Sequence, residues 1–185
     1  MSLTQYYTAT TLDGFIADTD DSLDWLFTRN QDRDGPLNYT EFVASVGALA
    51  MGSTTYQWIL DHRPADKDPA EWRWPYEQPC WVFTHRELPV VPGAQIQFTS
   101  AEIATVHEQM LAAATGRNLW IVGGGDVAGQ FADVGLLDEV VVYIAPITLG
   151  AGKPLLTRRL ELGLVETARN GDFVCARFSV MPPAA

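Results

Sequence analysis

The sequence predicts an α/β domain with a mixed, mostly parallel central sheet, helices on both faces and a C-terminal antiparallel hairpin. Short apolar runs alternate with segments of helical periodicity over most of the chain, which is the pattern of strands joined by helical crossovers. Two of these runs, ending at Gly52 and at Gly123, lead directly into a helical segment. Near the end, Asn170-Gly171 separates two further runs, which indicates a two-residue hairpin turn.

The composition favours one globular domain over residues 1–185. The chain has 185 residues, of which 47% are apolar and 19% charged, and no repeat or linker divides it. The charge-free run from Val140 to Gly152 contains Pro146 and is shorter than the roughly 20 apolar residues of a membrane-spanning helix. The N-terminal residues lack the basic and apolar regions of a secretion signal. We therefore expect a cytoplasmic protein that does not interact with membranes.

The charge balance restricts the partners. Twelve basic and 23 acidic residues give a formal net charge of −11, which argues against nucleic acid and anionic lipid surfaces. A small anionic ligand is still compatible, because helix N-termini and single arginines act locally. Cys80 and Cys175 lie in apolar runs and are expected to be reduced core residues. The three histidines lack the spacing of a zinc pair, so no metal site is expected.

The first half of the chain is expected to begin with a strand and a turn, followed by an acidic loop and then by alternating helices and strands. Val46 to Met51 is continuously apolar, as in a buried parallel strand. The segment from His62 to Pro79 is rich in Pro, Asp and Trp and is expected to be a long excursion. The expected elements are a strand at Leu3–Thr10, a turn at Thr11–Gly14, a short extended segment at Phe15–Ala17, a helix at Tyr39–Val46, a strand at Val46–Met51 and a helix at Thr55–Leu60.

The second half repeats the alternation and closes with the hairpin. Thr99-Ser100-Ala101-Glu102 has the spacing of a capping box, which predicts a helix start there, and Gly116 is placed to end that helix. The expected elements are strands at Cys80–Thr84, Gln95–Phe98, Leu119–Val122 and Val140–Ile147, a helix at Val127–Val134, and hairpin strands at Leu164–Arg169 and Phe173–Met181.

The glycines at Gly123, Gly124 and Gly125 are the first candidate for a binding site. They join a buried strand to a helix, so backbone N–H groups converge at a helix N-terminus with no side chain in the way of a close ligand. This arrangement suits a pyrophosphate. The alternative is a steep strand-to-helix turn, which explains three glycines poorly. The segment is not the dinucleotide fingerprint G-x-G-x-x-G, because Ala128 stands where the third glycine should be.

Two other strand ends carry polar residues. The strand at Val46–Met51 is followed by Gly52, Ser53 and Thr54. These residue types are typical of either an ordinary helix cap or a phosphate contact. Thr84-His85-Arg86 follows another and brings a guanidinium to the edge where open α/β sheets bind ligands. Three such junctions together favour a nucleotide site.

Four segments of the chain, in order, resemble the dihydrofolate reductase-like superfamily. Within it, they resemble the RibD C-terminal domain family of riboflavin-biosynthesis reductases, which includes 5-amino-6-(5-phosphoribosylamino)uracil reductase. The resemblance implies a dihydrofolate-reductase-like three-layer fold, NADPH as hydride donor, a pterin-like or pyrimidine-like substrate and a homodimer. The segments are Thr11-Leu12-Asp13-Gly14-Phe15-Ile16-Ala17, Met51-Gly52-Ser53-Thr54-Thr55-Tyr56, Val122-Gly123-Gly124-Gly125-Asp126-Val127, and Leu136 to Val140 continued by Ala145 to Gly152.

The resemblance also implies a set of cofactor contacts. It puts the nicotinamide beside the first segment, the phosphates beside the two glycine junctions and the adenosine end beside the third strand end. The implied residues are Ala9, Leu12, Gly14 and Ile16 at the nicotinamide, Gly52, Ser53 and Thr54 at the phosphates, Thr84, His85 and Arg86 at the adenosine, and Val122, Gly124, Gly125, Asp126 and Val127 around the pyrophosphate.

The chain departs from the family pattern on the substrate side. Riboflavin reductases usually carry a lysine, a second basic residue and a glutamate where this chain has Tyr7, Phe15 and Val122. This difference argues against a substrate with a phosphoribosyl group. Many dihydrofolate reductases carry arginine after Met-Gly to hold the 2′-phosphate of NADPH, and this chain has Ser53 there. Arg86 is the remaining candidate for that contact, because a guanidinium matches a phosphate in charge and geometry.

The catalytic group is the least defined part of the prediction. Asp24 is the candidate carboxylate, with Trp25 beside it as a flat surface for a heterocycle. Asp32 and Asp34 are alternatives, although acidic residues in such a loop are mostly solvated. The sequence therefore predicts an NADPH-dependent reductase of a small heterocycle. The alternative is a protein that binds NADP(H) in the same fold without turnover.

Overall fold

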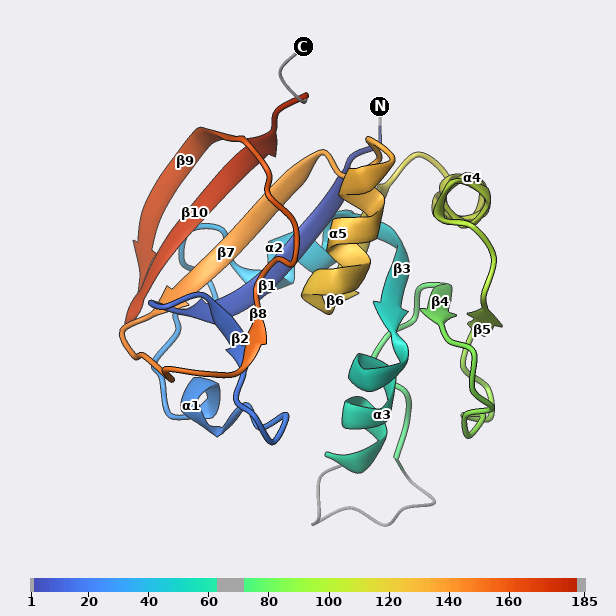
Figure 1. Ribbon diagram of the computed structural model, residues 1–185, viewed down its shortest axis with the longest axis horizontal. Coiled ribbons are helices and arrows are strands. Elements are labelled where there is room, and N and C mark those ends of the chain that lie inside the picture. Colours follow the sequence, from blue (N-terminus) through green and yellow to red (C-terminus); the bar gives the residue numbers. More distant parts are fainter. Residues whose placement is uncertain (1, 63–71, 183–185) are drawn as a thin grey trace.

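An eight-stranded sheet forms the middle of the molecule (Figure 1), and the computed structural model describes residues 2–62 and 72–182. The strand order is β5-β4-β3-β6-β1-β7-β10-β9. The strands are β1 (Thr4–Thr11), β3 (Val46–Gly52), β4 (Cys80–Phe83), β5 (Ile96–Thr99), β6 (Asn118–Gly123), β7 (Glu139–Ala145), β9 (Leu162–Asn170) and β10 (Phe173–Val180). The helices are α1 (Asp24–Phe27), α2 (Tyr39–Ser45), α3 (Ser53–Asp61), α4 (Ile103–Ala114) and α5 (Gly125–Asp133).

The sheet is parallel except at one edge. The strands from β5 to β7 pair in parallel, whereas β10 is antiparallel to both β7 and β9. The hairpin turn at that edge is Gly171-Asp172, one residue later than predicted, because Asn170 belongs to β9 and pairs with Phe173. Gly171, the first residue of the turn, has a positive φ of 59°, as a primed turn requires. The predicted mixed α/β fold with a C-terminal antiparallel hairpin is confirmed.

The order in which successive strands are added to the sheet reverses after β5. From β3 it runs outward through α3 to β4 and β5, and α4 then carries it back to β6 on the other side of β3. The carboxyl ends of β3 and β6 therefore lie side by side at a topological switch point, which is where open α/β sheets bind their ligands. Both glycine junctions predicted from the sequence are at this place.

Helices cover both faces of the sheet because neighbouring strand residues point to opposite sides. Tyr6 and Ile121 belong to a core packed with apolar residues of α4 and α5. Tyr7 and Trp120, one position along, belong to a second core with residues of α1, α2 and α3. Cys80 and Cys175 are buried free thiols in this second core, as expected.

A second, two-stranded sheet lies beside the main one. It pairs β2 (Phe15–Ala17) with β8 (Lys153–Pro154). We call residues 149–158 the strap, because they join β2 to α5: the Leu155 N–H donates to the Gly14 carbonyl at 2.8 Å, and Leu155 and Pro154 pack on Gly125. In Figure 1, β8 runs between the turn after β1 and the lower end of α5.

The structure differs from the local sequence predictions at the start of α4 and in the acidic loop. The capping box at residues 99–102 is wrong: α4 begins after Glu102 without a side-chain cap, and the Thr99 hydroxyl accepts the Ala101 N–H within the preceding turn. The acidic loop contains the short helix α1. Of the predicted excursion, residues 63–71 lie outside the described part of the chain.

No helix in the described ranges is long and apolar enough to span a membrane.

Candidate active site

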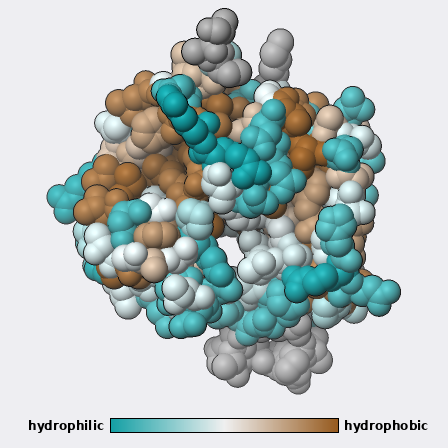
Figure 2. Space-filling view, viewed as in Figure 1, coloured by the Kyte–Doolittle hydropathy of each residue, from teal (hydrophilic) through white to brown (hydrophobic). Residues whose placement is uncertain are grey.

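A cleft of about 690 Å³ lies at the carboxyl ends of β3, β4 and β6. The strand ends and the first turns of α3 and α5 form one wall, and β2, Leu23 and the strap form the other. Figure 2 shows the molecule hollowed between these walls. Helix N-termini and strand carboxyl ends favour anions, so the position of the cleft suits a phosphorylated ligand.

Most of the predicted cofactor residues line this cleft, although they come from four separate segments. Ala9, Leu12 and Gly14 are not among its lining residues, and Leu12 is largely exposed. The predicted residues that do line it are Ile16, Gly52, Ser53, Thr54, Thr84, His85, Arg86, Val122, Gly124, Gly125, Asp126 and Val127.

The two glycine junctions pack against each other. A Cβ added at Gly52 would lie 3.2 Å from the Val127 side chain, and one added at Gly123 would lie 3.0 Å from the Thr55 hydroxyl. Each junction therefore makes room for a side chain of the other. Packing of the two strand-to-helix turns accounts for Gly52 and Gly123 without a ligand.

Gly124 and Gly125 have different surroundings. A Cβ at Gly125 would come within 2.4 Å of the Leu155 carbonyl oxygen and 2.6 Å of the Pro154 carbonyl oxygen. The strap therefore requires this glycine, and a part for Gly125 in binding a pyrophosphate stays a prediction. At Gly124 the nearest atom to an added Cβ is Ile16 Cδ1, at 3.7 Å. Of the three glycines, Gly124 alone leaves its Cβ position open to the cleft.

Arg86 and Ser53 meet at one end of the cleft. The Arg86 Nη2 donates to the Ser53 Oγ at 3.0 Å. The Thr84 hydroxyl fixes the turn, since it accepts the Arg86 N–H at 2.9 Å and donates to the Arg86 carbonyl at 3.1 Å. Within the described chain no carboxylate forms an ion pair with Arg86. A guanidinium and a hydroxyl thus lie within hydrogen-bond distance of each other where the carboxyl end of β4 meets the start of α3.

Asp126, in the first turn of α5, is held by its own partners. The Gln130 amide donates to it at 2.8 Å and Arg158 pairs with it at 3.3 Å. Arg158 also pairs with Asp133 at 2.8 Å. The strap therefore supplies a positive charge that offsets Asp126, which would otherwise repel an anion at the N-terminus of α5.

Asp13 holds the turn before β2. Its carboxylate accepts the Thr11 hydroxyl at 2.6 Å and the backbone N–H groups of Leu149 and Gly150 at 3.0 and 2.7 Å. These hydrogen bonds, that of Thr11 first, hold the pKa of Asp13 below its usual value. The charged carboxylate thereby ties the predicted nicotinamide segment to the strap.

The predicted substrate residues lie away from the cleft lining. Asp24 is exposed on α1, whereas Trp25 is only 7% exposed and packs in the second core. Asp32 and Asp34 stabilise their own loop and its contact with the end of β9. The Asp32 carboxylate accepts a hydrogen bond from the Asp34 N–H, and the Asp32 backbone N–H and carbonyl are both hydrogen-bonded to the Asn170 side chain. A part for Asp24 and Trp25 in catalysis stays a prediction.

Tyr7 and Phe42 form an aromatic pair where a cation was expected by resemblance. The two rings stack with centroids 4.2 Å apart, and the Tyr7 hydroxyl donates to the Leu37 carbonyl at 3.2 Å. Burial raises the pKa of Tyr7 above its ordinary value, so the side chain is neutral at physiological pH. Tyr7 is only 8% exposed, belongs to the second core and does not line the cleft, so a buried aromatic ring stands where the resemblance had suggested a lysine.

Several lining residues were not foreseen from the sequence. Trp58 stands one and a half turns into α3 and therefore belongs to the face shared with Thr54 and Thr55, a spacing that helical periodicity could have signalled. The strap residues Lys153 and Thr157 are more than 25 residues from the α5 junction, and no local pattern points to them. The lining residues missed were Thr8, Ala17, Asp21, Leu23, Thr55, Trp58, Phe83, Ser100, Ala101, Gln130, Lys153, Pro154 and Thr157.

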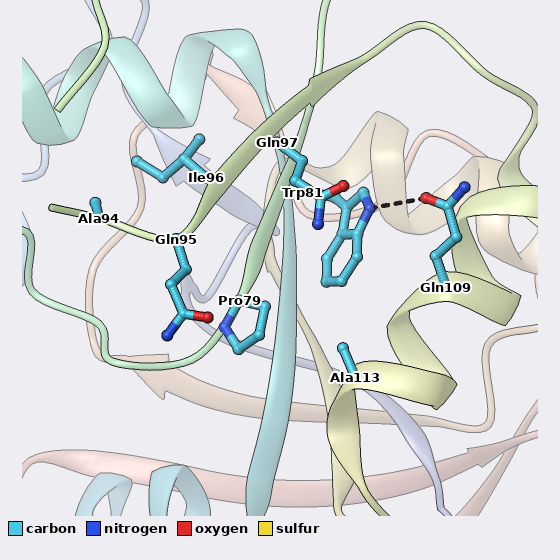
Figure 3. A pocket seen from close by; sticks show the side chains of 8 residues that line it. All are labelled: Pro79, Trp81, Ala94, Gln95, Ile96, Gln97, Gln109 and Ala113. Atoms are coloured by element: carbon cyan, nitrogen blue, oxygen red, sulfur yellow. Dashed lines mark hydrogen bonds between the residues drawn. The ribbon is translucent and has the colours of Figure 1, made fainter. Parts of the chain in front are cut away.

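A second hollow lies at the amino-terminal end of the edge strands, between β5 and α4 (Figure 3). Its volume is about 540 Å³ and its lining residues are all uncharged. The Trp81 indole N–H donates to the Gln109 side chain across it at 3.1 Å. Without a charged group or a strand carboxyl end, this hollow suits a phosphorylated ligand less well than the cleft.

Comparison with known proteins agrees with this geometry. The model of the RibD C-terminal domain family matches residues 4–171. The uncharacterized protein YwjB of Bacillus subtilis is 29% identical over 181 residues, covering 92% of this chain and 94% of its own length. A putative riboflavin biosynthesis protein from Shewanella sp. PV-4 superimposes with a TM-score of 0.79 at 24% identity, over 97% of this chain and 99% of that one.

A more distant structure shares the fold. Dihydrofolate reductase from Enterococcus faecalis, solved with NADP(H), superimposes with a TM-score of 0.54 at 13% identity, and the match covers 96% of both chains. The strand order and helix placement described above are thus those of the dihydrofolate-reductase-like fold. Because the family model spans most of the sequence, the chain belongs to the RibD C-terminal domain family, a family of reductase-like domains.

Proposed function

We propose that this protein is an NADPH-dependent reductase that transfers a hydride to a small pterin-like or pyrimidine-like heterocycle. The observation that carries the proposal is the Arg86–Ser53 pair in the same cleft as the open backbone of Gly124. A cation beside a hydroxyl suits a 2′-phosphate, and an unobstructed helix N-terminus suits a pyrophosphate. The dihydrofolate-reductase-like fold of this family supports the same reading.

In this proposal the protein contributes mainly orientation. NADPH supplies the hydride when bound. Arg86, Ser53 and the α5 N-terminus hold the phosphates, while Ile16 and Val122 give the inner end of the cleft apolar walls. Asp13 keeps the turn beside β2 in place through the strap. Fixing two reactants in one geometry can lower a barrier by several kcal/mol without a catalytic side chain.

The substrate we propose is flat and carries no phosphate. The described chain places Tyr7 and Phe42 in a stacked pair, and Phe15 is apolar, so neither family position supplies a cation for a phosphoribosyl group. An uncharged heterocycle needs none. A pterin or a simple pyrimidine therefore fits better than a phosphoribosylated riboflavin precursor.

A second function is supported by the carboxylates of the cleft. The two that line it within the described chain are Asp21 and Asp126, and both are ion-paired, with Lys153 and Arg158. Both carboxylates are therefore already engaged by a cation, and no other carboxylate of the described chain lines the cleft. The alternative is therefore a protein that binds NADP(H) without turnover. In that case neither a side chain nor a water molecule supplies the proton that reduction of the substrate requires.

The test is a titration followed by a turnover assay. NADPH binding is measured by the change of its fluorescence, and its oxidation at 340 nm is then followed with dihydrofolate, other reduced and oxidised pterins, pyrimidines and the phosphoribosylated precursor. Saturable binding with oxidation on a phosphate-free ring supports the reductase. Binding without oxidation on any substrate supports the alternative, and absence of saturable binding contradicts both.

The cytoplasmic location and the homodimer belong to the same proposal. The family resemblance supports a dimer, and a soluble reductase using NADPH would work in the cytoplasm. Sedimentation equilibrium of the purified protein checks the dimer, with a mass of twice 20.4 kDa expected. Cell fractionation checks the location.

A further inference from the structure

Lys153 and Asp21 form an ion pair inside the cleft. Both side chains line it, and the ammonium lies 3.5 Å from the Asp21 carboxylate. The two side chains keep 48% and 42% of their exposure, so the pair is hydrated and contributes little to folding. Lys153 can therefore leave the Asp21 carboxylate for another anion in the cleft at a small cost in free energy.

The strap brings Lys153 close to the N-terminus of α5. The Leu155 and Pro154 carbonyl groups lie against Gly125, and Lys153 directly precedes them in β8. Thr157, further along, touches Asp126 at 3.4 Å. Lys153 thus stands on the wall that faces the α5 N-terminus, where the proposed cofactor presents its pyrophosphate.

Among the described residues of the cleft, the charges leave Lys153 as the cation for that position. Of the lysines and arginines that line the cleft in the described chain, Arg86 is at the Ser53 end and Lys153 is on the strap. Arg158 is already bound to Asp126 and Asp133. The net charge of −11 repels anions at long range, so a phosphorylated ligand depends on such local cations.

We propose that Lys153 is a binding residue for the cofactor pyrophosphate and that Asp21 is a competing anion that holds it in the free protein. When the dinucleotide binds, the ammonium leaves the Asp21 carboxylate and contacts the pyrophosphate. This inference rests on the proposed function, because it assumes that NADPH occupies the cleft. It predicts opposite effects for the two partners of one ion pair.

A purely structural ion pair predicts something else. If the pair served to hold β2 against β8, loss of either residue would loosen that wall, and both changes would weaken cofactor binding. If the pair were an incidental surface contact, neither change would affect it. The sign of the Asp21 effect therefore separates the three cases.

The test uses the full chain with Lys153→Met, Lys153→Arg, Asp21→Asn and the double variant Asp21→Asn/Lys153→Met. Isothermal titration calorimetry measures the affinity for NADPH and for adenosine 2′-monophosphate, which has the 2′-phosphate but no pyrophosphate. Thermal melting of each variant checks that it folds. Arg86→Ala is the matched control, since it should weaken both ligands.

We expect Lys153→Met to weaken NADPH about tenfold, because a charge-assisted contact is lost, and to leave adenosine 2′-monophosphate unchanged. Lys153→Arg should retain most of the affinity. Asp21→Asn should tighten NADPH about two- to fivefold, since a surface pair no longer competes. The gain in NADPH affinity from Asp21→Asn should be smaller when Lys153 is already Met, because the double variant has no lysine that Asp21 could hold back.

Weaker NADPH binding by Asp21→Asn would overturn the inference, as would a Lys153→Met effect that is absent or equal for the two ligands. Either result leaves the proposed function standing if the wild-type protein binds NADPH. If the wild-type protein shows no saturable NADPH binding, the proposed function fails and the inference with it.

Discussion

The two strand-to-helix junctions of the cleft have the same local pattern and different surroundings. At the β3–α3 junction, Gly52 faces the Val127 side chain, and the next residue, Ser53, bonds to Arg86. At the β6–α5 junction, Gly124 is open to the cleft while Gly125 is pressed against the strap. A glycine at the start of a helix therefore makes room for packing at Gly52 and Gly125 and leaves open space at Gly124.

This difference bears on how glycine-rich turns are interpreted. A missing side chain can be required by another part of the chain that arrives at the same place. Gly125 illustrates this, because its constraint comes from Pro154 and Leu155. Substitutions at these glycines separate packing from ligand binding, and substitutions at Arg86 and Ser53 separate the cation from its hydroxyl partner.

Gly125→Val should have the largest effect, and it should be on folding. The added side chain meets backbone carbonyl oxygens that cannot turn away, so we expect a loss of about 3 kcal/mol or more in the free energy of unfolding. Urea denaturation measures it. A Gly125→Val protein with wild-type stability and weak NADPH binding would instead assign Gly125 to the ligand.

Arg86→Ala should act on the ligand and not on the fold. Arg86 is exposed and has no carboxylate partner in the described chain. Loss of a charge-assisted contact to the 2′-phosphate should cost about 1.5 to 3 kcal/mol, or one to two decades in NADPH affinity, with little change for NADH. Fluorescence titration with both cofactors checks this. Equal weakening of both would show that the 2′-phosphate is recognised elsewhere.

Gly124→Ala is the counterpart of Gly125→Val. Its added methyl has ordinary contact with Ile16 at 3.7 Å and a φ of −96° that alanine accepts, so stability should stay within about 1 kcal/mol of wild type. The methyl fills the space left for the pyrophosphate, and NADPH affinity should fall about tenfold. Unchanged affinity would remove Gly124 from the cofactor site.

Ser53→Ala should give the smallest effect. The hydroxyl is the neutral partner of Arg86, and loss of one such hydrogen bond should cost about 0.5 to 1.5 kcal/mol in NADPH affinity. Titration of the double variant with Arg86→Ala checks whether the two act together. A double variant no weaker than Arg86→Ala alone would show that Ser53 works through the arginine.

The sequence by itself determined the elements and the edge of the sheet where a site can form. Period-two and helical spacing are set by residues close in the chain, so the strands of the main sheet and the polar strand ends were predicted to within a few residues, whereas β8 and the short helix α1 were not predicted and the hairpin turn lies one residue later than expected. The family resemblance, spread over motifs from residue 11 to residue 152, then indicated which strand ends meet at one site.

The tertiary structure alone decided which of those residues meet. Arg86 reaches Ser53 across 33 residues, Lys153 and Asp21 pair within the cleft, and Trp25 is turned into the core. Such contacts depend on strand order and on the path of the strap, which local periodicity does not encode. For the same reason the sequence did not reveal that Gly125 packs against Leu155, which lies 30 residues further along the chain.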